Sequence, residues 1–472
     1  MRVINDKGVQ AHVIDDPNLH AFTIEIGRVQ YRIGQLVQPV FDIWIAQEAD
    51  AMGRRGVERA KYGEKNCFQI GLEHISVLGP SNNAFAKGKG MPLSKRSQVD
   101  PFIVMDVMEA ARSAEAKGRR IVHMEVGQPS TSAPLKARQA VAAALPRDAM
   151  GYTVALGLPE LRAEIAALYK RWYDVDLDPG RVVVTSGSSA GFLLAFTALF
   201  DPGAGVGVAA PGYPSYRQIL KALALTPVDI PTHASQGHQL QVSDLENRQL
   251  DGLLVASPGN PTGTMIDKPS LAALADFAQS RDIGFISDEI YHGIEYDKKA
   301  VTALEVTDRA YVINSFSKYF SMTGWRIGWL VVPQDHLRSI ERLAQNMFIC
   351  PPHVSQLAAL AALQSHDEMQ ENLAVYRQNR RLMLSGLPEA GLTQIAPPDG
   401  AFYIYADISE FGVDSRSFAA EVLQEAGVAL TPGLDFDPIR GHQTIRLSYA
   451  QATEEIIEGL RRLKRFMHDR YL

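Results

Sequence analysis

The sequence predicts an α/β fold with a mostly parallel sheet covered by helices, joined to a smaller α+β domain. Between Arg181 and Val332, short runs rich in β-branched residues alternate with longer amphipathic stretches. This alternation is typical of crossover connections between parallel strands. After Pro333 the pattern becomes helical through Leu363 and is mixed beyond it. We expect this last part, together with residues 92–126, to form the smaller domain.

The individual strands and helices are predicted from the length and composition of the apolar runs. Strands are expected at Val182–Thr185, Leu253–Ser257, Gly284–Ser287, Tyr311–Asn314 and Ile327–Val332. Helices are expected at Gly191–Phe200 and Leu271–Ser280. In open parallel sheets ligands bind at the carboxyl ends of the strands. The motifs that carry chemistry follow strands of this kind, so we expect them to meet at one edge of the sheet.

The composition is that of an ordinary globular protein. Of the 472 residues, 46% are hydrophobic and 21% charged, and the net charge is −6. These values give no sign of a nucleic-acid or membrane partner. The cysteines, Cys67 and Cys350, are too few for a disulfide framework, and the first thirty residues lack an apolar signal core. A cytoplasmic protein is therefore expected.

One segment, residues 315–329, combines a lysine with a set of anion-binding groups. Lys318 is flanked by Ser315 and Ser317, and Arg326 follows eight residues later. An amine able to form a Schiff base beside hydroxyls and a guanidinium is what pyridoxal 5′-phosphate requires. Such a lysine must be neutral, which needs burial or nearby positive charge. The segment resembles the cofactor-lysine signature of class I/II aminotransferases, within the fold-type I, aspartate-aminotransferase-like superfamily.

The resemblance covers residues 91–472 and implies an enzyme that moves an amino group from an L-amino acid to a 2-oxo acid. It implies a seven-stranded type of sheet in a large cofactor domain at residues 141–345. An N-terminal arm and part of the small domain would occupy residues 91–140, and an interdomain helix and the rest of the small domain residues 346–472. Lys318 would then also move the substrate's Cα proton.

Four further residues are assigned to the cofactor ring by this resemblance. Asp288, at the end of an apolar run, would pair with the pyridinium nitrogen, because a buried carboxylate needs a cationic partner. Tyr291 and Asn260, the latter in an Asn-Pro-x-Gly motif, would donate to the ring's phenolate oxygen. Alone, Asp288 could instead cap a following helix. Tyr213 would stack on the ring, whereas we expect Tyr216 to belong to the core.

The phosphate is expected at the small-residue turn of residues 184–191, between a strand and a helix, because free backbone amides at a helix start bind anions. The side chains assigned to it are Ser188, Ser189, Ser315, Ser317 and Arg326. An ordinary helix cap is the alternative for the serine turn. Tyr152 resembles the tyrosine that reaches the phosphate of a neighbouring subunit, which implies a homodimer.

The substrate's α-carboxylate is assigned to Arg446, whose planar guanidinium can bind it with two hydrogen bonds. Gly127 would allow the backbone to approach the same carboxylate. Two positions depart from the family pattern. Ser189 stands where relatives that prefer aspartate often carry lysine, and Asp437 where glycine is common. No metal site is expected, because the 12 histidines are scattered.

Residues 1–90 stand outside the resemblance. They form either a small appended domain or upstream sequence from a misassigned start, with Met91 the true start; we favour the second. On the same scaffold, a carbon–sulfur β-lyase or a decarboxylase is an alternative activity. An aminotransferase-like transcription regulator is a less favoured one, because a DNA-binding module should be basic and residues 1–90 have 11 basic and 10 acidic residues.

Overall fold

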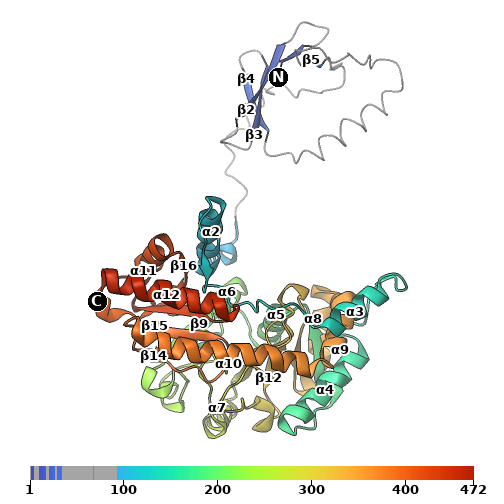
Figure 1. Ribbon diagram of the computed structural model, residues 1–472. Coiled ribbons are helices and arrows are strands. Elements are labelled where there is room, and N and C mark those ends of the chain that lie inside the picture. Colours follow the sequence, from blue (N-terminus) through green and yellow to red (C-terminus); the bar gives the residue numbers. More distant parts are fainter. Residues whose placement is uncertain (1, 5–9, 17–20, 27–28, 34–66, 69–92) are drawn as a thin grey trace, which may run out of the picture. The chain divides into compact units, whose positions relative to one another are not determined.

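The computed structural model describes residues 2–4, 10–16, 21–26, 29–33, 67–68 and 93–472 (Figure 1). The chain divides into two compact units, residues 1–92 and 93–472. In the first unit the described residues form one five-stranded sheet in the order β4-β3-β2-β1-β5. Its strands are β1 (Arg2–Ile4), β2 (Gln10–Asp16), β3 (Ala21–Ile26), β4 (Val29–Ile33) and β5 (Cys67–Phe68). These strands were not predicted, and the origin of residues 1–90 stays a prediction.

The second unit is built on a seven-stranded sheet in the order β7-β13-β12-β11-β10-β8-β9. Neighbouring strands from β9 to β12 run parallel, and β13 alone is antiparallel to both of its neighbours. The strands are β7 (Val182–Thr185), β8 (Gly205–Ala210), β9 (Thr226–Pro231), β10 (Gly252–Ala256), β11 (Gly284–Asp288), β12 (Tyr311–Ser315) and β13 (Gly328–Val331). The predicted mostly parallel sheet is confirmed.

This sheet forms because its central strands are apolar on both faces. In β12, Val312 packs into one hydrophobic cluster, while Tyr311 and Ile313 on the opposite face belong to another. Such continuous burial is characteristic of parallel sheets covered by helices on both sides. The five predicted strands are present with ends shifted by at most one residue. Strands β8 and β9 were missed.

The helices of this unit cover the sheet and join the smaller domain. They are α2 (Ile103–Ala116), α3 (Leu135–Ala144), α4 (Pro159–Tyr173), α5 (Ser188–Leu199), α6 (Pro214–Ala222), α7 (Lys268–Ser280), α8 (Leu337–Met347), α9 (His353–Ala362), α10 (His366–Glu389), α11 (Ser415–Glu421) and α12 (Thr453–Arg470). In Figure 1, α3, α4 and α9 group at one end, α11 and α12 lie at the other, and α10 runs between them. None of the helices in the described part is long and apolar enough to cross a membrane.

The smaller domain contains a four-stranded antiparallel sheet, β14-β15-β18-β17, and the parallel pair β16-β6. These strands are β6 (Val122–His123), β14 (Ile395–Ala396), β15 (Tyr403–Asp407), β16 (Val428–Ala429), β17 (Thr431–Pro432) and β18 (Thr444–Ser448). Because β6 pairs with β16, the segment before the large sheet joins the C-terminal part of the chain. The exact domain boundaries stay predictions.

Candidate active site

The predicted motifs gather at one edge of the large sheet. Asp288 is the last residue of β11, Ser315 ends β12, and the loop that begins at Ser257 follows β10. These three strands are parallel neighbours, so their carboxyl ends lie side by side. Strand β13 runs the opposite way and begins at Gly328, which brings the preceding Arg326 to the same edge.

Lys318 lies in the turn that follows β12. Its Nζ donates a hydrogen bond to the backbone carbonyl oxygen of Gly127 at 2.6 Å. Burial, together with the nearby positive charges of Arg446 and Arg326, lowers the pKa of Lys318 to about 8, whereas Asp288 acts in the opposite direction. A lysine in this environment is neutral in a substantial fraction of molecules near neutral pH, as a Schiff-base lysine must be.

Asp288 is buried and accepts two hydrogen bonds. The Tyr216 hydroxyl donates to Oδ2, and the backbone N–H of Ile290 donates to Oδ1 at 3.1 Å. Burial raises the pKa of Asp288 to about 6, although both hydrogen bonds act in the opposite direction. Tyr216 is a core residue as predicted, at 4% exposure, but its contact with Asp288 was not foreseen.

A pair of tyrosine hydroxyls lies next to Lys318. The Tyr291 and Tyr403 hydroxyl oxygens are 2.7 Å apart, and the Lys318 Nζ is 5.7 Å from the centroid of the Tyr291 ring. Tyr403 also explains the glycine at position 127, where a Cβ atom would fall 1.8 Å from the Tyr403 hydroxyl oxygen. The free space at Gly127 is therefore filled by a tyrosine of this chain.

Arg446 is buried in the middle of β18, which excludes the simple alternative of a surface ion pair. One guanidinium nitrogen, Nη1, donates to Asn260 Oδ1 at 3.0 Å, and Nη2 donates to the carbonyl oxygen of Glu125. The guanidinium lies between two aromatic rings, 4.5 Å from the centroid of Tyr403 and 4.6 Å from that of Phe436. Its Nε atom is buried and has no hydrogen-bond partner among the described residues.

A cradle for an anion lies where α5 begins. Gly187 precedes the helix with φ +76°, and no side chain caps the first backbone amides. A Cβ atom at Gly187 would be 2.5 Å from Arg326 Nη2, so only glycine leaves room for this guanidinium. Arg326 Nη1 is 3.5 Å from Ser317 Oγ, which in turn accepts from Ser315 Oγ at 2.8 Å. Ser188 is half-buried, whereas Ser189 is exposed.

These features fit a phosphate-bearing cofactor. Uncapped amides at a helix start favour an anion because of their orientation and the helix dipole. The Arg326 guanidinium supplies a full positive charge at the same place. The Nε atom of Arg446, which has no hydrogen-bond partner among the described residues, suits a second anionic group such as a carboxylate.

Two predicted tyrosines differ in their placement. Tyr213 is half-buried at the start of α6, and its ring packs edge-on against Tyr216 at 5.3 Å and Phe102 at 6.0 Å. Tyr152 is 85% exposed. The loop with Asp437, a position that departs from the family pattern, is closed by hydrogen bonds to Asp437 Oδ1 from the backbone N–H groups of Ile439 at 2.8 Å and Arg440 at 3.0 Å.

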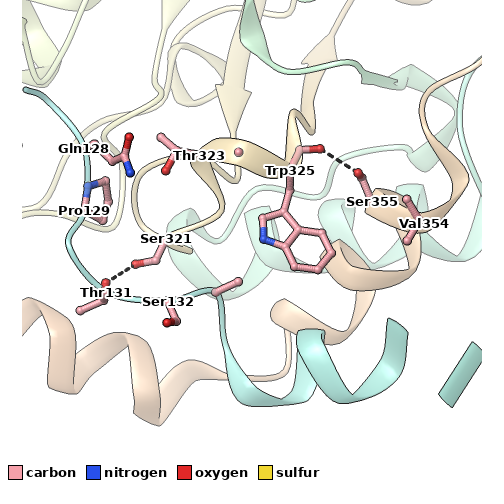
Figure 2. Close-up of a pocket in the computed structure, with 11 residues that line it drawn as sticks. Gln128, Pro129, Thr131, Ser132, Ser321, Thr323, Trp325, Val354 and Ser355 are labelled. Atoms are coloured by element: carbon pink, nitrogen blue, oxygen red, sulfur yellow. Dashed lines mark hydrogen bonds between the residues drawn. The ribbon is translucent and has the colours of Figure 1, made fainter. Parts of the chain in front are cut away.

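A pocket of about 420 Å³ begins one residue after Gly127 (Figure 2). Its lining includes Gln128, Thr131, Ser321 and Trp325, so it is bordered both by the segment after Gly127 and by the turn after Lys318. Figure 2 shows the Thr131 and Ser321 hydroxyls facing one another, at 2.7 Å. No lysine or arginine is among its lining residues.

Comparison with known proteins identifies the family of this chain. Residues 119–463 match the family model of the class I and II aminotransferases. The chain is 47% identical over 374 residues to valine–pyruvate aminotransferase of Mycobacterium tuberculosis, which covers 78% of this chain and 96% of that protein. It is 35% identical over 385 residues to (5-formylfuran-3-yl)methyl phosphate transaminase of Methanocaldococcus jannaschii, covering 80% of this chain and all of that one.

A solved structure from Silicibacter pomeroyi, described as an aminotransferase, is 64% identical and superimposes with a TM-score of 0.78. The match covers 80% of this chain and 100% of the chain in that structure. The chain therefore belongs to the class I and II aminotransferases, a family that depends on pyridoxal 5′-phosphate, and it transfers an amino group between an amino acid and a 2-oxo acid.

Proposed function

We propose that pyridoxal 5′-phosphate is the cofactor of this aminotransferase and that Lys318 is its point of attachment. The observation that carries the proposal is the environment of the Lys318 amine. Burial and two arginines lower its pKa to about 8 at the edge where Asp288, Tyr291 and Ser315 meet. When bound, the cofactor supplies an electron sink for negative charge on the substrate's Cα.

The residues of the chain would bind the cofactor and the substrate and move the proton. Asp288 would pair with the ring nitrogen, while Tyr291 and Asn260 would donate to the ring oxygen. Arg446 would bind the substrate's α-carboxylate, and the Lys318 amine would take the proton from the substrate's Cα as a base and release it as an acid. A positioned acid–base group of this kind contributes about 10²–10⁴-fold to the rate. The phosphate is held by the first amides of α5 together with Ser188, Ser189, Ser315, Ser317 and Arg326.

Titration of the cofactor-free protein with pyridoxal 5′-phosphate tests this assignment. We expect the wild type to develop a near-visible band that is absent from Lys318→Ala. We expect Arg326→Ala to develop the band only at higher cofactor concentration. A Lys318→Ala variant with the same band as the wild type would contradict the attachment point.

For the amino donor we propose an uncharged aliphatic amino acid, with pyruvate as the acceptor. The similarity to a valine–pyruvate aminotransferase supports this choice. The pocket beside Lys318 offers no cation for a second carboxylate, and Ser189 cannot supply one. Initial rates with pyruvate and L-valine, L-aspartate or L-phenylalanine test the proposal. A kcat/KM highest for L-aspartate would contradict it.

We further propose that the enzyme is a homodimer in which Tyr152 completes the partner's phosphate site. The backbone N–H of Thr153 lies 3.4 Å from Cys350 Sγ, which brings two loops together. Large apolar side chains on both loops are exposed, namely Tyr152 (85%), Val154 (56%), Met347 (43%) and Ile349 (54%). Such a cluster is typical of a protein interface.

Mixing two defective variants tests the shared site. In a dimer that contains one Lys318→Ala chain and one Tyr152→Ala chain, one of the two sites has both residues intact. We therefore expect the mixture, after exchange of subunits, to be more active than either variant alone. A mixture no more active than its components, or a monomer in sedimentation, would contradict the proposal.

A further inference from the structure

A buried histidine lies directly behind the motifs assigned to the cofactor. His292 follows Tyr291 and is 1% exposed. Its Nε2 atom is 2.9 Å from the backbone carbonyl oxygen of Ser257, and its Nδ1 atom is 2.6 Å from the Tyr173 hydroxyl. The three residues come from the turn after β11, the end of β10 and the end of α4. None of the roles assigned above involves His292 or Tyr173.

The hydrogen bonds fix the proton on this ring. A backbone carbonyl can only accept, so the proton of the neutral imidazole is on Nε2. Nδ1 must then accept from the Tyr173 hydroxyl. Burial lowers the pKa of His292 to about 3, which keeps the imidazole neutral throughout the working range of pH. The histidine is therefore a permanent donor to Ser257, with a fixed tautomer.

Glu289 is the other titratable group that faces His292. Its Oε1 atom accepts from the Ser287 and Thr302 hydroxyls and from the backbone N–H of Ala303. Its Oε2 atom is 3.6 Å from His292 Nδ1 and has no hydrogen-bond partner among the described residues. Burial raises the pKa of Glu289 to about 8, so the cluster carries little net charge near neutral pH.

The bond from His292 joins two loops that carry cofactor donors. Ser257 opens the loop that presents Asn260, and its own N–H donates to the Asp288 carbonyl oxygen at 3.2 Å. His292 belongs to the turn that presents Asp288 and Tyr291. The imidazole and this backbone bond therefore together hold the spacing between the loop that carries Asn260 and the turn that carries Tyr291.

We propose that His292 is a positioning residue that holds Asn260 and Tyr291 at the spacing at which both reach the cofactor's ring oxygen. This inference rests on the proposed function, because it presupposes that the two residues share that oxygen. Two donors on the ring oxygen affect how tightly the cofactor is held and the pH at which its absorbance changes. Both quantities can be measured without turnover.

Three variants separate the two hydrogen bonds of His292. His292→Leu removes both bonds, and Tyr173→Phe removes only the bond from the Tyr173 hydroxyl. His292→Gln can still donate a hydrogen bond to the Ser257 carbonyl oxygen. A matched pair of controls exists at the opposite end of β12, where the Tyr311 hydroxyl is 2.8 Å from His336 Nδ1. Tyr311→Phe and His336→Leu thus break a similar Tyr–His bond far from Lys318.

The measurements are the Kd of each cofactor-free variant for pyridoxal 5′-phosphate and the midpoint of the pH titration of the bound cofactor's absorbance. Loss of one buried hydrogen bond corresponds to about a tenfold change in an equilibrium constant. We expect His292→Leu to raise the Kd about tenfold or more and to move the midpoint. His292→Gln should remain within about threefold of the wild type, and both controls should match the wild type.

The inference is overturned if His292→Leu keeps the wild-type Kd and midpoint while it lowers Tm as His336→Leu does. If His292→Leu does not fold, Tyr173→Phe is compared with its control Tyr311→Phe. Equal Kd values and equal midpoints for these two variants would also overturn the inference. A wild-type protein that binds no pyridoxal 5′-phosphate would refute the proposed cofactor instead, which is a distinguishable result.

Discussion

Alanine at position 127 should disrupt the site through a steric clash. The new Cβ atom would lie 1.8 Å from the Tyr403 hydroxyl oxygen and 2.8 Å from the ring carbon that bears it. Non-bonded atoms need about 3.5 Å, so the ring must move by more than about 1 Å. Tyr403 is 1% exposed and packs 4.5 Å from the Arg446 guanidinium, so the ring cannot move alone. The 2.7 Å bond to Tyr291 would break.

The size of the effect follows from this geometry. Overpacking of a buried site costs about 1–3 kcal/mol of stability. A displacement of about 1 Å in a residue that positions reacting groups costs about 10²-fold in rate. We therefore expect Gly127→Ala to remain folded with a lower Tm and to lose about 10²-fold in kcat/KM for transamination.

Two variants make this prediction specific. Gly127→Ala combined with Tyr403→Phe removes the nearest clashing atom and should recover part of the lost activity. Gly205→Ala is the matched control, because its Cβ atom would meet only ordinary contacts of 3.5 Å and beyond. The reasoning is refuted if Gly127→Ala keeps wild-type kcat/KM, or if the double variant is no better than the single one.

Three more predictions concern the charged groups. Arg446→Lys should lower kcat/KM about 10–100-fold with the cofactor's absorbance unchanged, because a charge-assisted hydrogen bond contributes roughly 1.5–3 kcal/mol. Asp288→Asn should lower kcat by a similar factor, since it loses the charge that pairs with the ring nitrogen. In the cofactor-free protein, the folded pKa of Lys318 is about 8, below its usual value of 10.5. The unfolded chain then binds more protons between these values, so stability should rise with pH from about 8 to 10.5, and Lys318→Met should lack this rise.

Each of these has a clear contradicting result. For Arg446, the control is Arg162→Lys, whose side chain donates to the carbonyl oxygens of Gly180 and Val182 at the start of β7, the opposite edge of the sheet; equal losses in both variants would argue against carboxylate binding. An Asp288→Asn enzyme with full kcat would contradict the pairing with the ring. For Lys318, a Tm difference between wild type and Lys318→Met that stays constant from pH 8 to pH 10 would contradict the lowered pKa.

The sequence predicted the central strands because their apolar runs are continuous. It missed β8 and β9 for different reasons. In strand β8, Gly205–Ala210, two valines alternate with glycines and are followed by two alanines, and glycine and alanine have little strand preference. Strand β9 contains Pro227 and Pro231, which argue against a strand, yet it lies at the edge of the sheet where proline is tolerated. The helical pattern also continued beyond Leu363, because α10 extends to Glu389.

The sequence predicted those candidate site residues that belong to short, recognisable motifs. Lys318, Asp288 and Asn260 each lie at or shortly after the end of a strand, within such a motif. Tyr403 and Tyr216 were not foreseen as site residues, because they lie within a strand and a helix whose facing partners depend on long-range packing. The need for glycine at position 127 was a usable signal, but it does not reveal which side chain fills the space.

The central claim is that Lys318 carries the cofactor. Borohydride reduction of the holoenzyme, followed by proteolysis and mass spectrometry, tests it most directly, because reduction makes the link between lysine and cofactor permanent. The account predicts a phosphopyridoxyl group on the peptide that contains Lys318 and on no other. A modification on a different lysine, or none on an enzyme that still shows the cofactor's absorbance, would contradict it.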